Sequence, residues 1–274
     1  MDMMEYTKEV SSIFSTRNLD SSIELSSLIK MINLGSSLTN DEREMLIALL
    51  QKYIRVYFND YLNLILNSVN LINPNKYKSI NDFYILPIKS QEDFNKPKSC
   101  DCVYYLFCNI QDIKSSLIFK NKKLHSATEN SIPKNIRTSS AKHLILIDDF
   151  SGTGKTIQSY LHHLEQDLNI PKNKFSIVLI ASMKESYDYL TSNGYDVYCN
   201  IIQEKGISGI NNIAIQKKYR IIMQNLENKF GFRECDKFGY GKAESLISLI
   251  RTPNNTFPIF WDGKRNKNAP FERN

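Results

Sequence analysis

Apolar residues recur every three or four positions along residues 1 to about 74, where Gly, Pro and strand-forming runs are nearly absent. This spacing predicts helices. Ser21 and Glu24 resemble a capping box at the start of one helix, which Gly35 can end. Thr39 and Glu42 repeat the signature ahead of a longer apolar stripe, so we expect one long amphipathic helix that packs in a core or a domain interface. The stripe consists of Met45, Leu46, Leu49, Leu50, Tyr53, Ile54, Tyr57, Phe58, Tyr61, Leu62 and Ile65.

The pattern changes after Asn73-Pro74. Short apolar runs rich in β-branched and aromatic residues follow at 83–88, 103–107, 143–147, 175–181 and 196–202, and each predicts a strand buried on both faces. Helical patterns separate the last three runs, and two further helices are expected at 213–230 and 242–251. This alternation indicates an α/β fold with a mostly parallel sheet and flanking helices. We therefore expect two domains, an all-helical one over residues 1–74 and an α/β one over residues 75–274.

The composition excludes several classes of protein. With 42% hydrophobic and 23% charged residues, the chain is neither collagen-like nor disordered. We find no leader pattern and no run of about 18 apolar residues, so we expect a cytoplasmic protein with no membrane association. The five cysteines form no C-x-x-C pair, which favours reduced thiols over a zinc site.

Residues 111–143 are locally basic. Two interpretations stay open for residues 114–142: a solvated loop, which can also act as a flap near a site, and a contact surface for nucleic acid. The segment has only Asp112 and Glu129 as acids, and its basic residues are Lys114, Lys120, Lys122, Lys123, Lys134, Arg137 and Lys142.

The candidate chemistry lies in residues 143–156, HLILIDDFSGTGKT, where a buried strand leads into two carboxylates, a loop of small residues and a helix. The helix start would expose backbone N–H groups that favour a phosphate, and glycines would let the backbone approach it closely. Asp148 and Asp149 end the strand, where ligands bind in open α/β sheets. Adjacent carboxylates can accept hydrogen bonds from a vicinal diol or hold a divalent metal through its waters.

Two known phosphate motifs compete for this stretch. The Walker A loop, G-x-x-x-x-G-K-[ST], fits Gly154, Lys155 and Thr156 but would put Asp149 at its first glycine. The stretch resembles instead the phosphoribosyl diphosphate (PRPP) motif of type I phosphoribosyltransferases. That motif has four apolar residues, two acidic residues, three variable residues and then Thr-Gly-x-Thr, and residues 144–156 fill every position.

The resemblance implies roles for individual residues. Asp148 and Asp149 would bind the ribose hydroxyls and act as the catalytic pair, and Mg²⁺ would accompany PRPP. A second loop would hold the diphosphate, for which residues 89–99 are the candidate, with Lys89, Ser90, Lys98 and Ser99 as contacts. Here the sequence departs from common transferases, since no clear helix separates this loop from the run at 103–107. The 5-phosphate loop would consist of Ser151, Gly152, Thr153, Gly154, Lys155 and Thr156.

Residues 239–261 resemble the closing motif of a divergent branch of phosphoribosyltransferase-like proteins. That branch occurs in bacterial conflict and antiviral defence systems, including some retron operons. Asn254, Asn255 and Trp261 are the candidates for an acceptor pocket, with packing of a turn as the alternative.

The two resemblances together imply a phosphoribosyltransferase-like, Rossmann-like fold. The implied function is a transferase, effector or toxin acting on PRPP or a related phosphorylated ribosyl substrate. One alternative is a catalytically weak PRPP or nucleotide sensor whose N-terminal helical domain docks a protein partner. The other alternative is nucleoside triphosphate hydrolysis by a degenerate P-loop.

Overall fold

A five-stranded, wholly parallel sheet organises residues 57–203 of the computed structural model, which describes residues 1–16, 22–90 and 96–273. The strand order is β3-β2-β4-β5-β6. β5 is buried along its whole length, which explains why its sequence is mostly apolar, with only Ser176 and Ser182 as polar residues, and does not alternate. The strands are β2 (Asp82–Pro87), β3 (Lys123–Ser126), β4 (Lys142–Ser151), β5 (Phe175–Met183) and β6 (Val197–Gln203).

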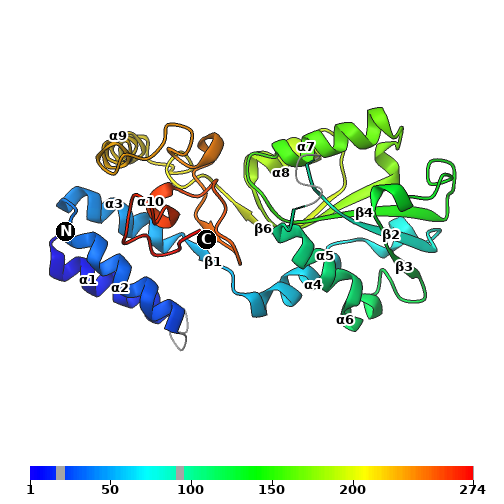
Figure 1. The fold of residues 1–274 in the computed structure, drawn as a ribbon, viewed down its shortest axis with the longest axis horizontal. Coiled ribbons are helices and arrows are strands. Elements are labelled where there is room, and N and C mark those ends of the chain that lie inside the picture. Colours follow the sequence, from blue (N-terminus) through cyan, green and yellow to red (C-terminus); the bar gives the residue numbers. More distant parts are fainter. Residues whose placement is uncertain (17–21, 91–95, 274) are drawn as a thin grey trace. The chain divides into compact units, whose positions relative to one another are not determined.

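Helices cover both faces of this sheet (Figure 1). α7 (Lys155–His162) and α8 (Lys184–Ser192) lie on one face, where side chains of α7 share a core with Leu144 and Leu146. The opposite face carries α4 (Tyr61–Asn70), α5 (Ser99–Asn109) and α6 (Gln111–Ser115). Short helical turns complete this unit: η1 (Phe58–Asp60), η2 (Pro74–Tyr77), η4 (Glu129–Ser131), η5 (His163–Asp167) and η6 (Lys172–Lys174).

The strand order places a topological switch point between β2 and β4. The chain leaves β2 toward β3 on one side, and it then enters β4 on the other side of β2. The loops after these two neighbouring strands therefore diverge and leave a crevice at the carboxyl ends, which is where ligands bind in open parallel sheets.

The remaining described residues form a second compact unit, built from residues 1–16, 22–56 and 204–273. Tyr53, Phe260 and Phe271 pack together in its core, with the rings of Tyr53 and Phe271 4.4 Å apart. A short parallel pair joins Ile54–Arg55 (β1) to Ile247–Ser248 (β7). The helices are α1 (Met3–Ser15), α2 (Ser22–Ser36), α3 (Asn40–Gln51), α9 (Ile213–Lys229), η7 (Tyr240–Lys242) and α10 (Pro258–Trp261). We call this the helical unit and residues 57–203 the α/β unit.

The α/β fold with flanking helices is confirmed, whereas the compact units have other bounds than the expected 1–74 and 75–274. Residues 57–74 pack beneath the sheet through α4, where the Ser68 hydroxyl donates to the Leu179 carbonyl oxygen at 2.7 Å. Residues 204–274 share their core with the N-terminal helices. The helical unit is therefore discontinuous in sequence.

Three element predictions are wrong. Residues 103–107 belong to α5, with Val103 and Phe107 buried and Tyr105 exposed, as one turn of helix requires. The expected long helix ends at Gln51 and restarts at Tyr61. Residues 242–251 form turns and β7, because left-handed backbone at Gly241, Lys242 and Glu244 is incompatible with a helix.

Two other element predictions are confirmed where the structure describes them. The capping box at Thr39 and Glu42 is present and α9 is confirmed, while Ser21 lies outside the described residues. No helix in residues 1–16, 22–90 and 96–273 is long and apolar enough to cross a membrane. All five cysteines are free thiols.

Candidate functional site

The acidic pair lies at the carboxyl end of β4, beside the switch point. Asp149 is buried, and Asp148 is partly buried. The backbone N–H of Asp149 donates to Oδ1 of Asp148 at 2.8 Å. Burial raises the pKa of both carboxyls, and the negative charge of Asp149 adds to the increase at Asp148. Such a pair favours the approach of a cation or of hydroxyl donors.

The loop after β2 meets this pair through Ser99. The Ser99 hydroxyl, at the first residue of α5, donates to Oδ1 of Asp149 at 2.8 Å. Ser99, which we predicted to contact the diphosphate, therefore lies in contact with Asp149, which we predicted to bind the ribose. The sequence had suggested that no helix follows this loop, because residues 103–107 were expected to form a strand. These residues belong to α5, which starts at Ser99, so a helix does follow the loop.

The predicted phosphate loop leads into α7 through Gly154. Gly154 has φ +75° and caps the helix, a left-handed conformation that favours glycine. A Cβ at this position would lie 2.7 Å from the Ser186 hydroxyl, which itself hydrogen bonds the Ser151 hydroxyl at 2.6 Å. Lys155 and Thr156 are exposed in the first turn of α7, whose N–H groups have no acceptor within the helix.

Lys89 of the second loop already has an ionic partner within the protein. The Lys89 ammonium lies 2.6 Å from Oδ1 of Asp101 and donates to the Lys96 carbonyl oxygen. Asp101 also accepts from the Lys98 backbone N–H at 2.8 Å, which caps α5. Ser90 is partly buried in the same loop. The positive charge of Lys89 is therefore largely offset before any diphosphate arrives.

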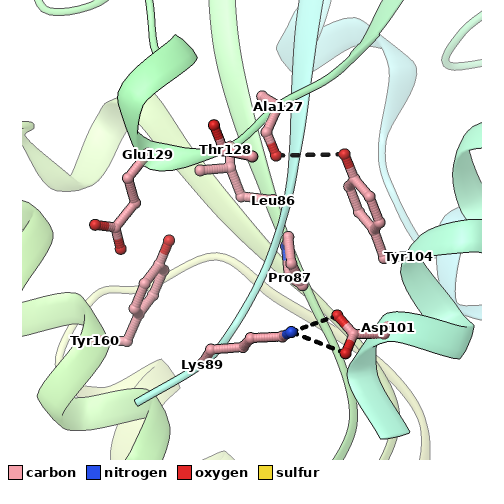
Figure 2. Close-up of a pocket in the computed structure, with 9 residues that line it drawn as sticks. All are labelled: Leu86, Pro87, Lys89, Asp101, Tyr104, Ala127, Thr128, Glu129 and Tyr160. Atoms are coloured by element: carbon pink, nitrogen blue, oxygen red, sulfur yellow. Dashed lines mark hydrogen bonds and ion pairs between the residues drawn. The ribbon is translucent and has the colours of Figure 1, made fainter. Parts of the chain in front are cut away.

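A pocket of about 180 Å³ opens next to this loop (Figure 2). Leu86 and Pro87 end β2 at its base, and the rings of Tyr104 and Tyr160 stand on either side. The Tyr104 hydroxyl donates to the Ala127 carbonyl oxygen at 3.3 Å. The lining residues are Leu86, Pro87, Lys89, Asp101, Tyr104, Ala127, Thr128, Glu129 and Tyr160.

Sequence reasoning missed most of this pocket. Tyr104 was assigned to a strand, and Glu129 counted only as an acid within the basic segment. Tyr160 lies on α7, the helix after the phosphate loop, where an aromatic residue at helical spacing is usually part of the core. Asp101 carried a usable signal, because an acid three residues after Lys98 is the spacing of a helix cap.

The three residues proposed for an acceptor pocket belong to the helical unit. Asn255 and Trp261 are buried, and both donate their side-chain N–H to backbone carbonyl oxygens, those of Tyr240 and Thr256. The Asn254 carbonyl oxygen accepts from the Tyr240 N–H at 2.7 Å. These contacts favour the packing alternative, while the role of the three residues toward an acceptor stays a prediction.

The site can be tested for its fit to Mg²⁺. The described residues contain no group of three or more His, Cys, Asp or Glu side chains that could hold a metal ion. The pair of carboxylates is nevertheless adequate, because Mg²⁺ keeps several waters and is commonly bound by one or two carboxylates together with substrate phosphates. Asp148 and Asp149 are the residues that fit this role.

Comparison with known proteins agrees with this geometry. No curated protein and no solved structure matches the chain. A family model described as PRTase-CE matches residues 17–273, which include the whole strand, loop and helix of the acidic motif. The sheet and its flanking helices accordingly form a phosphoribosyltransferase-like α/β fold. The chain belongs to the PRTase-CE family, a family of the phosphoribosyltransferase type.

Proposed function

We propose that the chain binds PRPP with Mg²⁺ in the crevice between β2 and β4, in the cytoplasm, and transfers the ribosyl 5-phosphate group to an acceptor. The hydrogen bond from Ser99 to Asp149 carries the proposal. It joins the ends of the two loops that a diphosphate and a ribose would each occupy, at the one position in the sheet where such loops diverge.

Each part of the ligand has a matching element. The 5-phosphate would lie against the loop 151–154 and the first turn of α7, where N–H groups and hydroxyls donate. The ribose hydroxyls would donate to Asp148 and Asp149. Positive charge developing at the anomeric carbon would be stabilised by these carboxylates, so the catalysis is electrostatic and positional and needs no nucleophilic side chain. When bound, Mg²⁺ would neutralise charge on the leaving diphosphate.

The experiment is a calorimetric titration of PRPP with Mg²⁺ into the wild type, the double variant Asp148→Asn/Asp149→Asn and a control, Asp112→Asn. Asp112 is an exposed acid on α6 of the same unit. We expect the double variant to lose affinity by about a hundredfold or more, since several hydrogen bonds to charged groups are lost. Its melting temperature should not fall, because two buried carboxyls that disfavour ionisation become neutral. An unchanged affinity in a folded double variant would remove the ribose-binding role.

A specific observation favours a second candidate, a PRPP or nucleotide sensor that binds without turnover. The Lys89–Asp101 ion pair offsets the charge of Lys89, so this lysine attracts a diphosphate less strongly. Product analysis after incubation with PRPP and Mg²⁺ separates the two candidates. Release of diphosphate indicates the enzyme, and tight binding with intact PRPP indicates the sensor.

Three further proposals concern a biological role and macromolecular partners. A role in bacterial antiviral defence rests only on the resemblance of residues 239–261. Nucleic acid binding by residues 114–142 would use the lysines that still face solvent, since Lys122 donates to the Ile80 carbonyl oxygen and Lys142 to the Asn135 side chain. Such binding should weaken steeply with salt, and an absence of RNA binding at low salt would remove it. A protein partner for the N-terminal helices stays a prediction.

A further inference from the structure

The pocket beside the Lys89–Asp101 pair has the wrong charge for a phosphate. Asp101 and Glu129 line it with carboxylates, whereas Lys89 is the only cationic side chain among the described residues that line it and is already paired. Behind Glu129, the His163 ring lies 3.2 Å from that carboxylate and 2.7 Å from Asp167. Even with His163 protonated, these five groups sum to one negative charge, so an anion is disfavoured here.

The walls of the pocket favour a flat group. The Tyr104 and Tyr160 rings face its interior from two sides, with Leu86 and Pro87 between them (Figure 2). Aromatic faces attract cations, and a planar guanidinium or amidinium stacks on them while its edge donates to a carboxylate. Glu129 supplies that carboxylate, because it lines the pocket and its carboxylate lies beside the Tyr160 hydroxyl (Figure 2).

Glu129 is held where it is. His163, bonded through its other nitrogen to Asp167, fixes one oxygen of the Glu129 carboxylate from outside the pocket. Asp167 and Glu129 together raise the pKa of His163, the Asp167 hydrogen bond most of all, so the ring supports the carboxylate as a cation over a wider pH range than a free histidine would. The Glu129 carboxylate also interacts with the Tyr160 hydroxyl, whose pKa is raised by burial and then by the charge and hydrogen bond of Glu129. A ligand would therefore share Glu129 with His163 and Tyr160.

The pocket also adjoins the proposed ribose site. One helical turn, Ser99, Cys100 and Asp101, provides the contact to Asp149 at one end and the pocket wall at the other. Burial is the main cause of the raised pKa of the Cys100 thiol, and the negative charges of Asp148, Asp101 and Asp149 raise it further. The two sites therefore share this turn.

We propose that this pocket is the acceptor subsite and that it takes a planar guanidinium or amidinium group. The acceptor role rests on the proposed function, and the binding of the planar cation does not. In the transfer, a guanidine nitrogen forms a bond to the anomeric carbon while the bond from that carbon to the diphosphate oxygen breaks. The diphosphate leaves with the electron pair, and one proton of the guanidinium passes to water.

The binding test uses benzamidine as the planar cation and benzoate as its anionic counterpart, each titrated calorimetrically into the full chain. We expect benzamidine to bind and benzoate not to bind. Glu129→Gln should weaken benzamidine about tenfold or more, a loss on the scale of one hydrogen bond to a charged group. Asp112→Asn, at an exposed acid that does not line the pocket, should change nothing. Equal binding of benzoate, or an unchanged affinity in Glu129→Gln, would overturn the proposal.

A second variant guards against a folding defect. Tyr104→Leu keeps an apolar side chain on α5 but removes one aromatic face, so benzamidine should weaken while the neutral probe benzyl alcohol should not. Weakening of both probes alike would mean that the pocket recognises bulk and not charge, which contradicts the proposal.

The acceptor role is tested separately with methylguanidine, PRPP and Mg²⁺, followed by mass spectrometry for methylguanidine carrying ribosyl 5-phosphate. The same adduct should be lost in Glu129→Gln, although PRPP affinity should persist there. If PRPP and benzamidine both bind and no adduct forms, the acceptor assignment is wrong. If PRPP fails to bind and benzamidine still does, the proposed function fails and the cation pocket stands.

Discussion

The two motifs that stand out in the sequence, residues 148–156 and residues 239–261, use their polar groups in opposite ways. In the second motif, Asn255 and Trp261 donate to backbone carbonyl oxygens, and Thr256 donates to that of Ile247 at 2.8 Å. In the first, Lys155 and Thr156 are exposed, and Asp149 receives one side-chain donor, Ser99, from another element.

The difference separates a motif that builds the fold from one that is open to a ligand. Buried polar groups are costly unless they are hydrogen bonded, so a chain normally provides their partners. Residues 239–261 have those partners within the helical unit. The acidic pair has fewer, and its raised pKa values mark the cost. Substitutions in the second motif should therefore act on stability, and those in the first mainly on binding.

The largest effect is expected for Gly239→Ala in the helical unit. Gly239 has φ +75°, and an added Cβ would lie 1.9 Å from the Asn255 carbonyl oxygen. Backbone strain and steric overlap together should cost about 3 kcal/mol or more of the free energy of unfolding. Gly231→Ala is the matched control, because Gly231 has φ +66° with nothing within 4 Å. Denaturant titration of both variants gives the comparison, and equal losses would show that overlap with Asn255 contributes nothing.

The next effect is expected at Gly154, in the α/β unit. Gly154→Ala should cost about 1–3 kcal/mol of folding free energy through its left-handed backbone and the contact with Ser186. Gly194→Ala shares the backbone conformation, at φ +78°, but has open space around it. Only the Gly154 variant should also lose PRPP affinity. Equal PRPP affinity in the two variants would place the phosphate elsewhere.

A pH-dependent effect of about 1 kcal/mol or more is expected from Glu227 of α9. Burial raises the pKa of this fully buried carboxyl to about 8, so the folded chain keeps a proton that the unfolded chain releases. Stability should therefore fall as pH rises from about 4.5 to about 8. The Glu227→Gln variant should show a flatter profile over this interval in denaturant titrations. A profile identical to the wild type would mean that Glu227 is ionised in the folded chain.

The smallest effect is expected for Lys155→Ala. Position 155 is the variable residue of Thr-Gly-x-Thr, and its side chain is exposed, so PRPP affinity should fall by about 1 kcal/mol or less. Thr153→Val, which removes a hydroxyl from the loop, should be more harmful. Titrations with PRPP and with ATP decide between the two phosphate motifs. If Lys155→Ala is the more harmful change and ATP binds more tightly, the loop acts as a P-loop.

Sequence patterns predicted the parallel sheet and the acidic motif because both depend on local order. A buried strand, two carboxylates and a glycine loop follow one another directly in the sequence, so their pattern can be recognised without knowing the rest of the fold. The run at 103–107 was misassigned because a short apolar aromatic run fits a strand and a buried helix equally well. The pocket could not be predicted, since Leu86, Tyr104, Glu129 and Tyr160 come from four elements that only the sheet brings together.

The division of the chain into two units could not be predicted from local sequence patterns either. Nothing in the spacing of residues 45–65 shows that Tyr53 packs on Phe271, because the two residues are far apart in sequence. The apolar stripe correctly indicated a core, but its partner was a long-range property of the fold.

The discontinuity of the helical unit sets an order of assembly during synthesis. A ribosome delivers residues 1–56 first, yet their apolar partners, from Ile207 to Phe271, emerge last. The sheet of residues 57–203 is complete before then, and domains commonly fold as they emerge. The apolar faces of the N-terminal helices that pack against residues 207–271 therefore stay uncovered until this later segment has been synthesised.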